Sequence, residues 1–141
     1  MLFRSARILA IDFGEKRTGI AVSDPLQMIA NGLTTVDTTR LEQFLVDYVA
    51  KESVERFVIG FPTTLRNEPA VVTAQITPFV EKLKRRFPAI PVELVDERFT
   101  SKMAFQTMID GGLKKKARQN KGLIDQISAT IILQTYLESK R

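Results

Sequence analysis

Residues 7–23 read RILAIDFGEKRTGIAVS, and this stretch decides the fold. An apolar run at residues 8–11 ends on Asp12, a turn follows at residues 14–17, and a second apolar run occupies residues 18–23. Two short apolar runs joined by a turn that contains glycine are typical of a β-hairpin. Asp12 therefore stands at a strand end in apolar surroundings, where a buried carboxylate is costly unless something compensates it.

Outward from this hairpin, the chain alternates between strand and helix patterns, which predicts a mixed five-stranded α/β sheet flanked by helices. Strands that follow the first helix should run parallel to the first strand, because right-handed crossovers dominate. Pro78 is expected to kink or interrupt its helix. The predicted strands are 7–13, 18–23, 28–36, 54–60 and 91–97. A first helix is predicted with Thr38 or Thr39 as its cap, and further helices are predicted over 70–87, 100–110 and 122–140.

The composition excludes several kinds of site. The 141 residues include no cysteine and no histidine, which rules out a Ser-His-Asp triad, a histidine base and ordinary zinc sites. Any metal must therefore be held by carboxylates and water. The length predicts a single domain over 1–141. No apolar run has the length of a signal peptide or approaches the roughly 20 residues of a membrane span, so a cytoplasmic protein without membrane contact is expected.

Two further acidic residues stand at element ends. Glu97 ends the apolar run at 91–97, and Asp125 lies in the run at 123–127, near the start of the last predicted helix. Asp12 and Glu97 both stand at the carboxyl ends of strands that should be parallel, so they are expected at one edge of the sheet. This is the edge at which ligands bind in open α/β sheets. A hard divalent cation, Mg²⁺ or Mn²⁺, would compensate such carboxylates, since it prefers oxygen ligands. The pattern favours a metal-dependent phosphoryl-transfer enzyme, and among these a nuclease.

Simpler interpretations of these acids stay open at the level of the sequence. Asp125 suits an ordinary cap near a helix start, and Asp12 suits a turn. Glu97 suits a salt bridge to Arg98 or a solvated strand end. Asp96 and Glu97 point to opposite faces of a strand, and the alternation does not say which one faces the site.

Small residues follow Asp125 on the same helix face. Ser128 and Ala129 lie three and four residues further along the chain, which is one turn of a helix. Side chains of this size would let the helix approach the sheet closely. The expected result is that Asp125 comes near Asp12.

Basic residues indicate a polyanionic partner. The net charge is +5, which suits a nucleic-acid partner and is equally compatible with an ordinary soluble basic protein. Residues 114–121 read KKKARQNK, five positive charges in eight residues, and a basic loop of this kind grips a phosphate backbone. Phenylalanines at 44, 57, 79 and 87 sit at core spacing and are interpreted as packing. The predicted nucleic-acid contacts are Lys16, Arg17, Arg98, Lys114, Lys115, Lys116, Arg118 and Lys121. For Arg98, a salt bridge to one of the acidic residues is an equally good interpretation.

Four ordered motifs together resemble one family. They are residues 11–25 (IDFGEKRTGIAVSDP), 58–62 (VIGFP), 96–101 (DERFTS) and 121–137 (KGLIDQISATIILQTYL). The chain resembles the YqgF-type proteins, the pre-16S rRNA nuclease and Holliday-junction resolvase-like family, from about residue 8 to residue 138. That resemblance implies a ribonuclease-H-like fold. It also implies that Asp12, Glu97 and Asp125 are both the catalytic residues and the ligands of two Mg²⁺ or Mn²⁺ ions.

The resemblance further implies hydrolysis of phosphodiester bonds at the 5′ end of precursor 16S rRNA, with resolution of branched DNA as the alternative. A monomer or a homodimer would serve. Three positions depart from the family pattern: residues 63–68 lack the usual Asp-Gly pair, Ser128 replaces alanine, and Gly60 stands where resolvase relatives carry glutamate. The sequence leaves open whether Asp24 also contributes to the site.

Two other functions compete with the nuclease. The spacing of Asp12, Gly14 and Gly19 also occurs in the phosphate-binding hairpins of sugar kinases and actin-like ATPases, but those need two such domains, and this chain has the length of one. A non-catalytic nucleic-acid-binding protein is the second alternative. The acidic residues argue against it, because a pure binding protein has no need of them.

Overall fold

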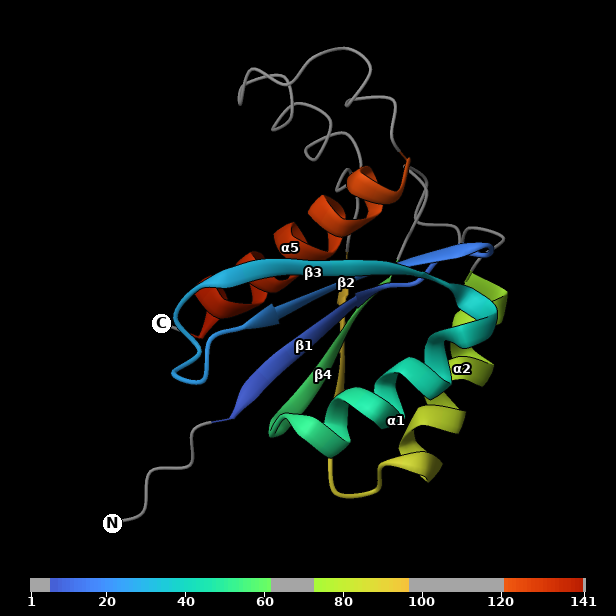
Figure 1. Ribbon diagram of the computed structural model, residues 1–141, viewed down its shortest axis with the longest axis horizontal. Helices are drawn as coiled ribbons and strands as arrows, with labels where there is room; N and C mark the ends of the chain where they lie inside the picture. Colours follow the sequence, from blue (N-terminus) through green and yellow to red (C-terminus); the bar gives the residue numbers. More distant parts are fainter. Residues whose placement is uncertain (1–5, 62–72, 97–120, 141) are drawn as a thin grey trace.

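The computed structural model describes residues 6–61, 73–96 and 121–140, and these form one sheet covered on both faces (Figure 1). The strand order is β3-β2-β1-β4-β5. β2 runs antiparallel to both β1 and β3, whereas β4 is parallel to β1 and β5 is parallel to β4. The predicted mixed five-stranded sheet is thereby confirmed. The strands are β1 (Arg7–Asp12), β2 (Arg17–Ser23), β3 (Ala30–Asp37), β4 (Val54–Phe61) and β5 (Val92–Asp96).

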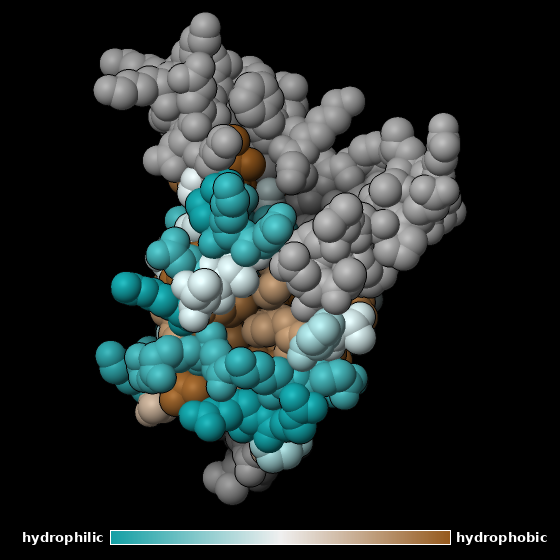
Figure 2. Space-filling model, turned by 90° about the vertical axis from the view of Figure 1, so that its right-hand side faces the viewer, coloured by the Kyte–Doolittle hydropathy of each residue, from teal (hydrophilic) through white to brown (hydrophobic). Residues whose placement is uncertain are grey.

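Helices cover both faces of this sheet. α1 and α2 lie on one face, and α5 lies across the other (Figure 1). Figure 2 views the side of α1 and α2, where hydrophilic side chains occupy most of the lower half. None of the described helices is long and apolar enough to cross a membrane. The helical elements are η1 (Thr38–Arg40), α1 (Leu41–Lys51), α2 (Thr73–Arg86) and α5 (Lys121–Ser139).

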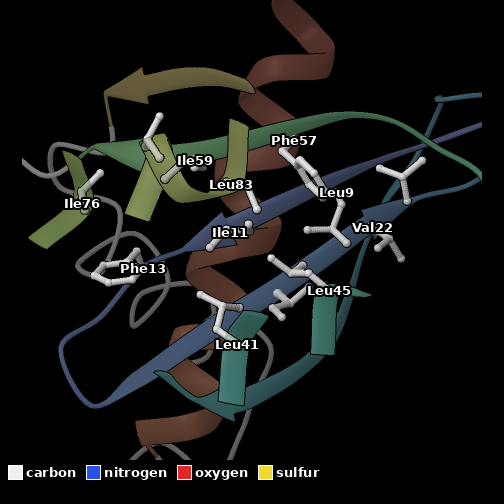
Figure 3. Close-up of a cluster of buried hydrophobic side chains, with 13 residues drawn as sticks. Leu9, Ile11, Phe13, Val22, Leu41, Leu45, Phe57, Ile59, Ile76 and Leu83 are labelled. Carbon is white, nitrogen blue, oxygen red and sulfur yellow. The ribbon is translucent and has the colours of Figure 1, made fainter. Parts of the chain in front are cut away.

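Strand alternation divides the core into two layers. Leu9 and Ile11 of β1 point toward α1 and α2, where they are fully buried with Phe57 (Figure 3). Ile8 and Ala10 point the other way, into the cluster under α5. The predicted packing role of the phenylalanines is confirmed, because positions 44, 57, 79 and 87 all belong to the first layer. Burying a large apolar side chain contributes about 1.5–3 kcal/mol, so each layer stabilises the sheet from its own side.

Two local expectations about the helices are wrong in detail. Neither Thr38 nor Thr39 caps a helix, because Asp37 occupies the cap position of η1 and Arg40 occupies that of α1. The Thr38 hydroxyl instead bonds to the hairpin turn. Of the two outcomes expected at Pro78, a break is wrong because α2 is continuous from Thr73 to Arg86, and a kink stays a prediction. The predicted helix over 100–110 and the loop over 63–68 lie outside the described residues.

Candidate active site

Asp12 is the last residue of β1 and faces α5. It pairs in register with Gly19 of β2. Side chains alternate along a strand, and Ile8 and Ala10 pack under α5, so Asp12 lies on that same face. Its backbone belongs to the strand ladder, which removes the interpretation of Asp12 as a turn residue.

Asp125 is the fifth residue of α5 and not its cap. The helix begins at Lys121 and carries no acidic residue in its first turn. A Cβ built on Gly19 would lie 2.0 Å from the Asp125 carbonyl oxygen. No side chain fits in that space, so α5 rests directly on the backbone of β2. Because Gly19 also pairs with Asp12, the two acids flank one glycine on one face of the sheet.

The small residues after Asp125 pack as expected. Ser128 and Ala129 are both fully buried against the sheet. Gly32 of β3 adds a second close approach, since a Cβ there would lie 2.7 Å from the side-chain amide nitrogen of Gln126. Within the described part of the chain, the Ser128 hydroxyl has no hydrogen-bond partner. The helix thus depends on small residues on both sides of its contact with the sheet.

Arg17 forms an ion pair with Asp125, which sequence reasoning missed. The Arg17 Nε lies 2.9 Å from Oδ2 of Asp125, and the two side chains are 39% and 23% exposed. The pair joins residues that are 108 positions apart. A signal was present in the strand pattern, because Arg17 lies two residues before Gly19 and so shares its face. Arg17 was expected to contact substrate phosphate, and here it contacts a candidate metal ligand.

The turn that carries Arg17 is fixed by Thr38. The Thr38 hydroxyl donates to the Gly14 carbonyl at 2.7 Å, and its backbone N–H donates to the Lys16 carbonyl at 2.9 Å. The Thr18 hydroxyl lies 2.9 Å from that of Thr38. A Cβ on Gly14 would lie 2.1 Å from the Arg17 carbonyl oxygen, so only glycine fits there. These contacts set where the exposed Lys16 and the partly buried Arg17 stand.

Asp24 lies at the other end of the sheet. It follows Ser23, whose hydroxyl accepts from the Ile8 backbone N–H near the start of β1. Its Oδ1 accepts from the backbone N–H groups of Met28 and Ile29 at 2.8 and 2.7 Å. The N–H of Ile29 lowers the pKa of the Asp24 carboxyl most, burial opposes it as the next-largest effect, and the N–H groups of Met28 and Leu26 bring the balance to a lowered pKa. Asp24 therefore holds the β2–β3 loop and stands away from Asp12.

The remaining predicted residues are not placed. β5 ends at Asp96, which pairs with Phe61, and Glu97 with Arg98 lies beyond the described residues. The same holds for Lys114, Lys115, Lys116 and Arg118, while Lys121 is placed only as the first residue of α5. Val95 contacts the cluster under α5. Within the described ranges no three acidic residues gather in one place.

The mixed five-stranded sheet with helices on both faces defines an α/β domain of the ribonuclease-H-like class. A solved structure described as "T. thermophilus RuvC in complex with Holliday junction substrate" has this fold, with a TM-score of 0.57, 19% sequence identity, and coverage of 96% of this chain and 95% of that one. Identity this low carries the fold alone.

Comparison of sequences goes further. The family model RuvX, described as "Holliday junction resolvase", matches residues 6–139. Proteins named "Putative pre-16S rRNA nuclease" are 65% identical over 136 residues in Bacteroides thetaiotaomicron and 60% identical over 134 residues in Flavobacterium psychrophilum. These matches cover 96% and 95% of this chain and 99% and 98% of the relatives. The chain belongs to the RuvX family, and it is an enzyme of the nuclease class that hydrolyses phosphodiester bonds.

Proposed function

We propose that this enzyme uses Asp12, Glu97 and Asp125 to hold divalent metal and processes the 5′ end of precursor 16S rRNA. One observation carries the site: Gly19 is paired with Asp12 and lies against the backbone of Asp125. The rRNA substrate is taken from the names of relatives that match nearly the full chain. Resolution of a branched DNA junction is the second candidate, favoured by the description of the matching family model.

The residues fit Mg²⁺ or Mn²⁺. Carboxylate oxygens are the ligands these ions prefer, and the chain has no cysteine or histidine that would favour zinc. The guanidinium of Arg17 already lies 2.9 Å from Asp125, so this carboxylate accommodates a cation at partial burial. We propose two ions, held by Asp12 and Asp125 together with Glu97.

Bound metal would supply water of lowered pKa and stabilise the charge on the leaving 3′ oxygen. The chain itself does the positioning. Asp12, on the rigid end of β1, and Asp125, on α5, are fixed relative to each other because the helix rests on Gly19. Lys16 is exposed on the turn that Thr38 holds, where it meets substrate phosphate. Preset positions of this kind lower the barrier because little has to move during the reaction.

Nucleic acid is the proposed partner, as monomer or homodimer of this chain. Phosphate contacts supply affinity and orientation but little choice of sequence. The net charge of +5 supports such contacts. The residues proposed for them are Lys16, Arg17, Arg98, Lys114, Lys115, Lys116, Arg118 and Lys121.

A cleavage assay on two substrates tests the proposal. A fragment spanning the 5′ end of precursor 16S rRNA and a four-way DNA junction are incubated with the protein in Mn²⁺, and in EDTA as control. We expect Mn²⁺-dependent cutting of the rRNA fragment by the wild type and no cutting by Asp12→Asn. Cutting of the junction alone would replace the substrate and keep the site. Absence of cutting on both would refute the proposed reaction.

A further inference from the structure

Arg17 and Asp125 form a pair that a metal-binding carboxylate would have to give up. Only the Nε of Arg17 bonds to Asp125 among the described contacts, and a guanidinium has five N–H donors. The pair is partly buried, with side chains 39% and 23% exposed, so water and salt screen it less than a surface pair. The same carboxylate is one of the proposed metal ligands.

A guanidinium and a divalent cation compete for this carboxylate. Two positive groups on one oxygen pair repel each other at contact distance. Metal binding therefore favours departure of Arg17 from Asp125. Departure needs only a side-chain rotation, because the backbone of the turn is held by Thr38 and by the tight Gly14 contact.

We propose that Arg17 is the resident counter-cation of Asp125 and exchanges this carboxylate for a substrate phosphate when divalent metal binds. The inference rests on the proposed metal site and adds an order of events to it. Before metal binds, Arg17 balances Asp125. After metal binds, the freed guanidinium offers its donors to phosphate, which is the bidentate geometry that arginine favours. Metal and nucleic acid then strengthen each other's binding through one side chain.

Lys16 provides the matched control. It is the neighbouring residue, it carries the same charge, and it is exposed with no ion pair among the described residues. Lys16→Gln and Arg17→Gln each remove one positive charge from the same turn. Only the second removes a partner of Asp125. The difference between them isolates the pair from the general effect of charge.

The first measurement is titration calorimetry with Mn²⁺ alone, without nucleic acid. We expect Arg17→Gln to bind Mn²⁺ about fivefold more tightly than the wild type, which corresponds to a pair worth about 1 kcal/mol. Lys16→Gln should change the Kd less than about twofold, because exposed charges at a distance are screened. Arg17→Lys keeps the charge without the Nε geometry and serves as a second variant. It should bind Mn²⁺ with an affinity between that of the wild type and that of Arg17→Gln.

The second measurement is the salt dependence of nucleic-acid binding on the rRNA fragment. Loss of one phosphate contact lowers the slope of log affinity against log salt by about one. For Arg17→Gln, the salt slope of the KM measured with Mn²⁺ should be smaller by about one than that of the wild type. The salt slope of the Kd measured in EDTA should be unchanged. A side chain with a purely structural role would not make the slope depend on metal.

The outcomes separate this inference from the function beneath it. An Arg17→Gln Kd for Mn²⁺ equal to or weaker than that of the wild type, with Asp125→Asn binding weakened, would overturn the exchange and leave the metal site standing. An equal change in the Kd for Mn²⁺ of the Lys16→Gln and Arg17→Gln proteins would also overturn it. Identical Mn²⁺ binding by the wild type and Asp125→Asn would overturn both the exchange and the proposed site.

Discussion

Gly19 sets how closely α5 approaches β2, and through that it brings the backbone of Asp125 near the strand end that carries Asp12. Its missing side chain lets the Asp125 carbonyl come within 2.0 Å of where a Cβ would stand, while its backbone pairs with Asp12. Strand and helix patterns predicted this approach only in outline, from Ser128 and Ala129 on the helix. The sheet contributes a glycine at the same contact. This depends on the register between β1 and β2 and on where α5 crosses β2, which the sequence alone does not specify.

Replacing Gly19 by alanine should therefore be costly. The new methyl group would meet backbone atoms of α5, which have little freedom to move, and overpacking of this kind costs about 3 kcal/mol. Gly32→Ala is the matched control, since its methyl group would meet side-chain atoms of Gln126 and Thr130 rather than backbone, and it should cost about 1 kcal/mol. Urea unfolding of both variants measures the free energies of unfolding. Equal losses would contradict this account of the helix contact.

Two buried serines should respond oppositely to removal of their hydroxyls. Ser23 Oγ accepts from the Ile8 N–H and donates to the Asp24 carbonyl, both at 2.9 Å. Ser128 Oγ has no partner among the described residues. We expect Ser23→Ala to lower the free energy of unfolding by about 2 kcal/mol and Ser128→Ala to raise it by about 1 kcal/mol. Thermal and urea unfolding would check both, and a loss of stability in Ser128→Ala would show that this hydroxyl is paired.

At the scale of elements, the sequence predicted which segments are strands and helices better than how their ends are used. The hairpin, the later parallel strands and the final helix follow from apolar periodicity and crossover handedness. Because threonine commonly caps helices, the sequence predicts a cap at Thr38 or Thr39. The Thr38 hydroxyl instead reaches the Gly14 carbonyl, a contact across 24 residues that no local pattern predicts. The ion pair between Arg17 and Asp125 likewise joins residues that are far apart in the chain, and the strand pattern indicated only that Arg17 shares a face with Gly19.

The β2–β3 loop should lose stability in acid through Asp24. Backbone N–H groups hold the pKa of this carboxyl below its ordinary value of 3.8, so the folded state favours the charged form. The contribution is present at neutral pH and is lost as pH falls through and below about 4. Asp24→Asn should thus be less stable than the wild type at pH 7, and the difference in free energy of unfolding should shrink by pH 3. A difference that stays constant from pH 7 to pH 3 would contradict the carboxylate's role.

At the scale of the whole molecule, the strand order and directions place Asp12 and the end of β5 at the same edge of the sheet. β1 and β4 run parallel at the centre, so the carboxyl end of β1 carries Asp12 to the same edge as the end of β5. Asp24 belongs to the opposite end, although it lies in the same sequence motif as Asp12. Composition had already directed attention to carboxylates by excluding histidine and cysteine. The fold decides which carboxylates come together.

The most direct test is the single-turnover rate of cleavage in Mn²⁺ for Asp125→Asn beside Asp24→Asn, on the substrate that the wild type cuts. Both variants exchange one carboxylate for an amide of the same shape, at opposite ends of the sheet. We predict that Asp125→Asn lowers the rate about a thousandfold, because several kcal/mol of metal-supplied stabilisation are lost. Asp24→Asn should cut at close to the wild-type rate. Wild-type cleavage by a folded Asp125→Asn protein would contradict the assignment of this site.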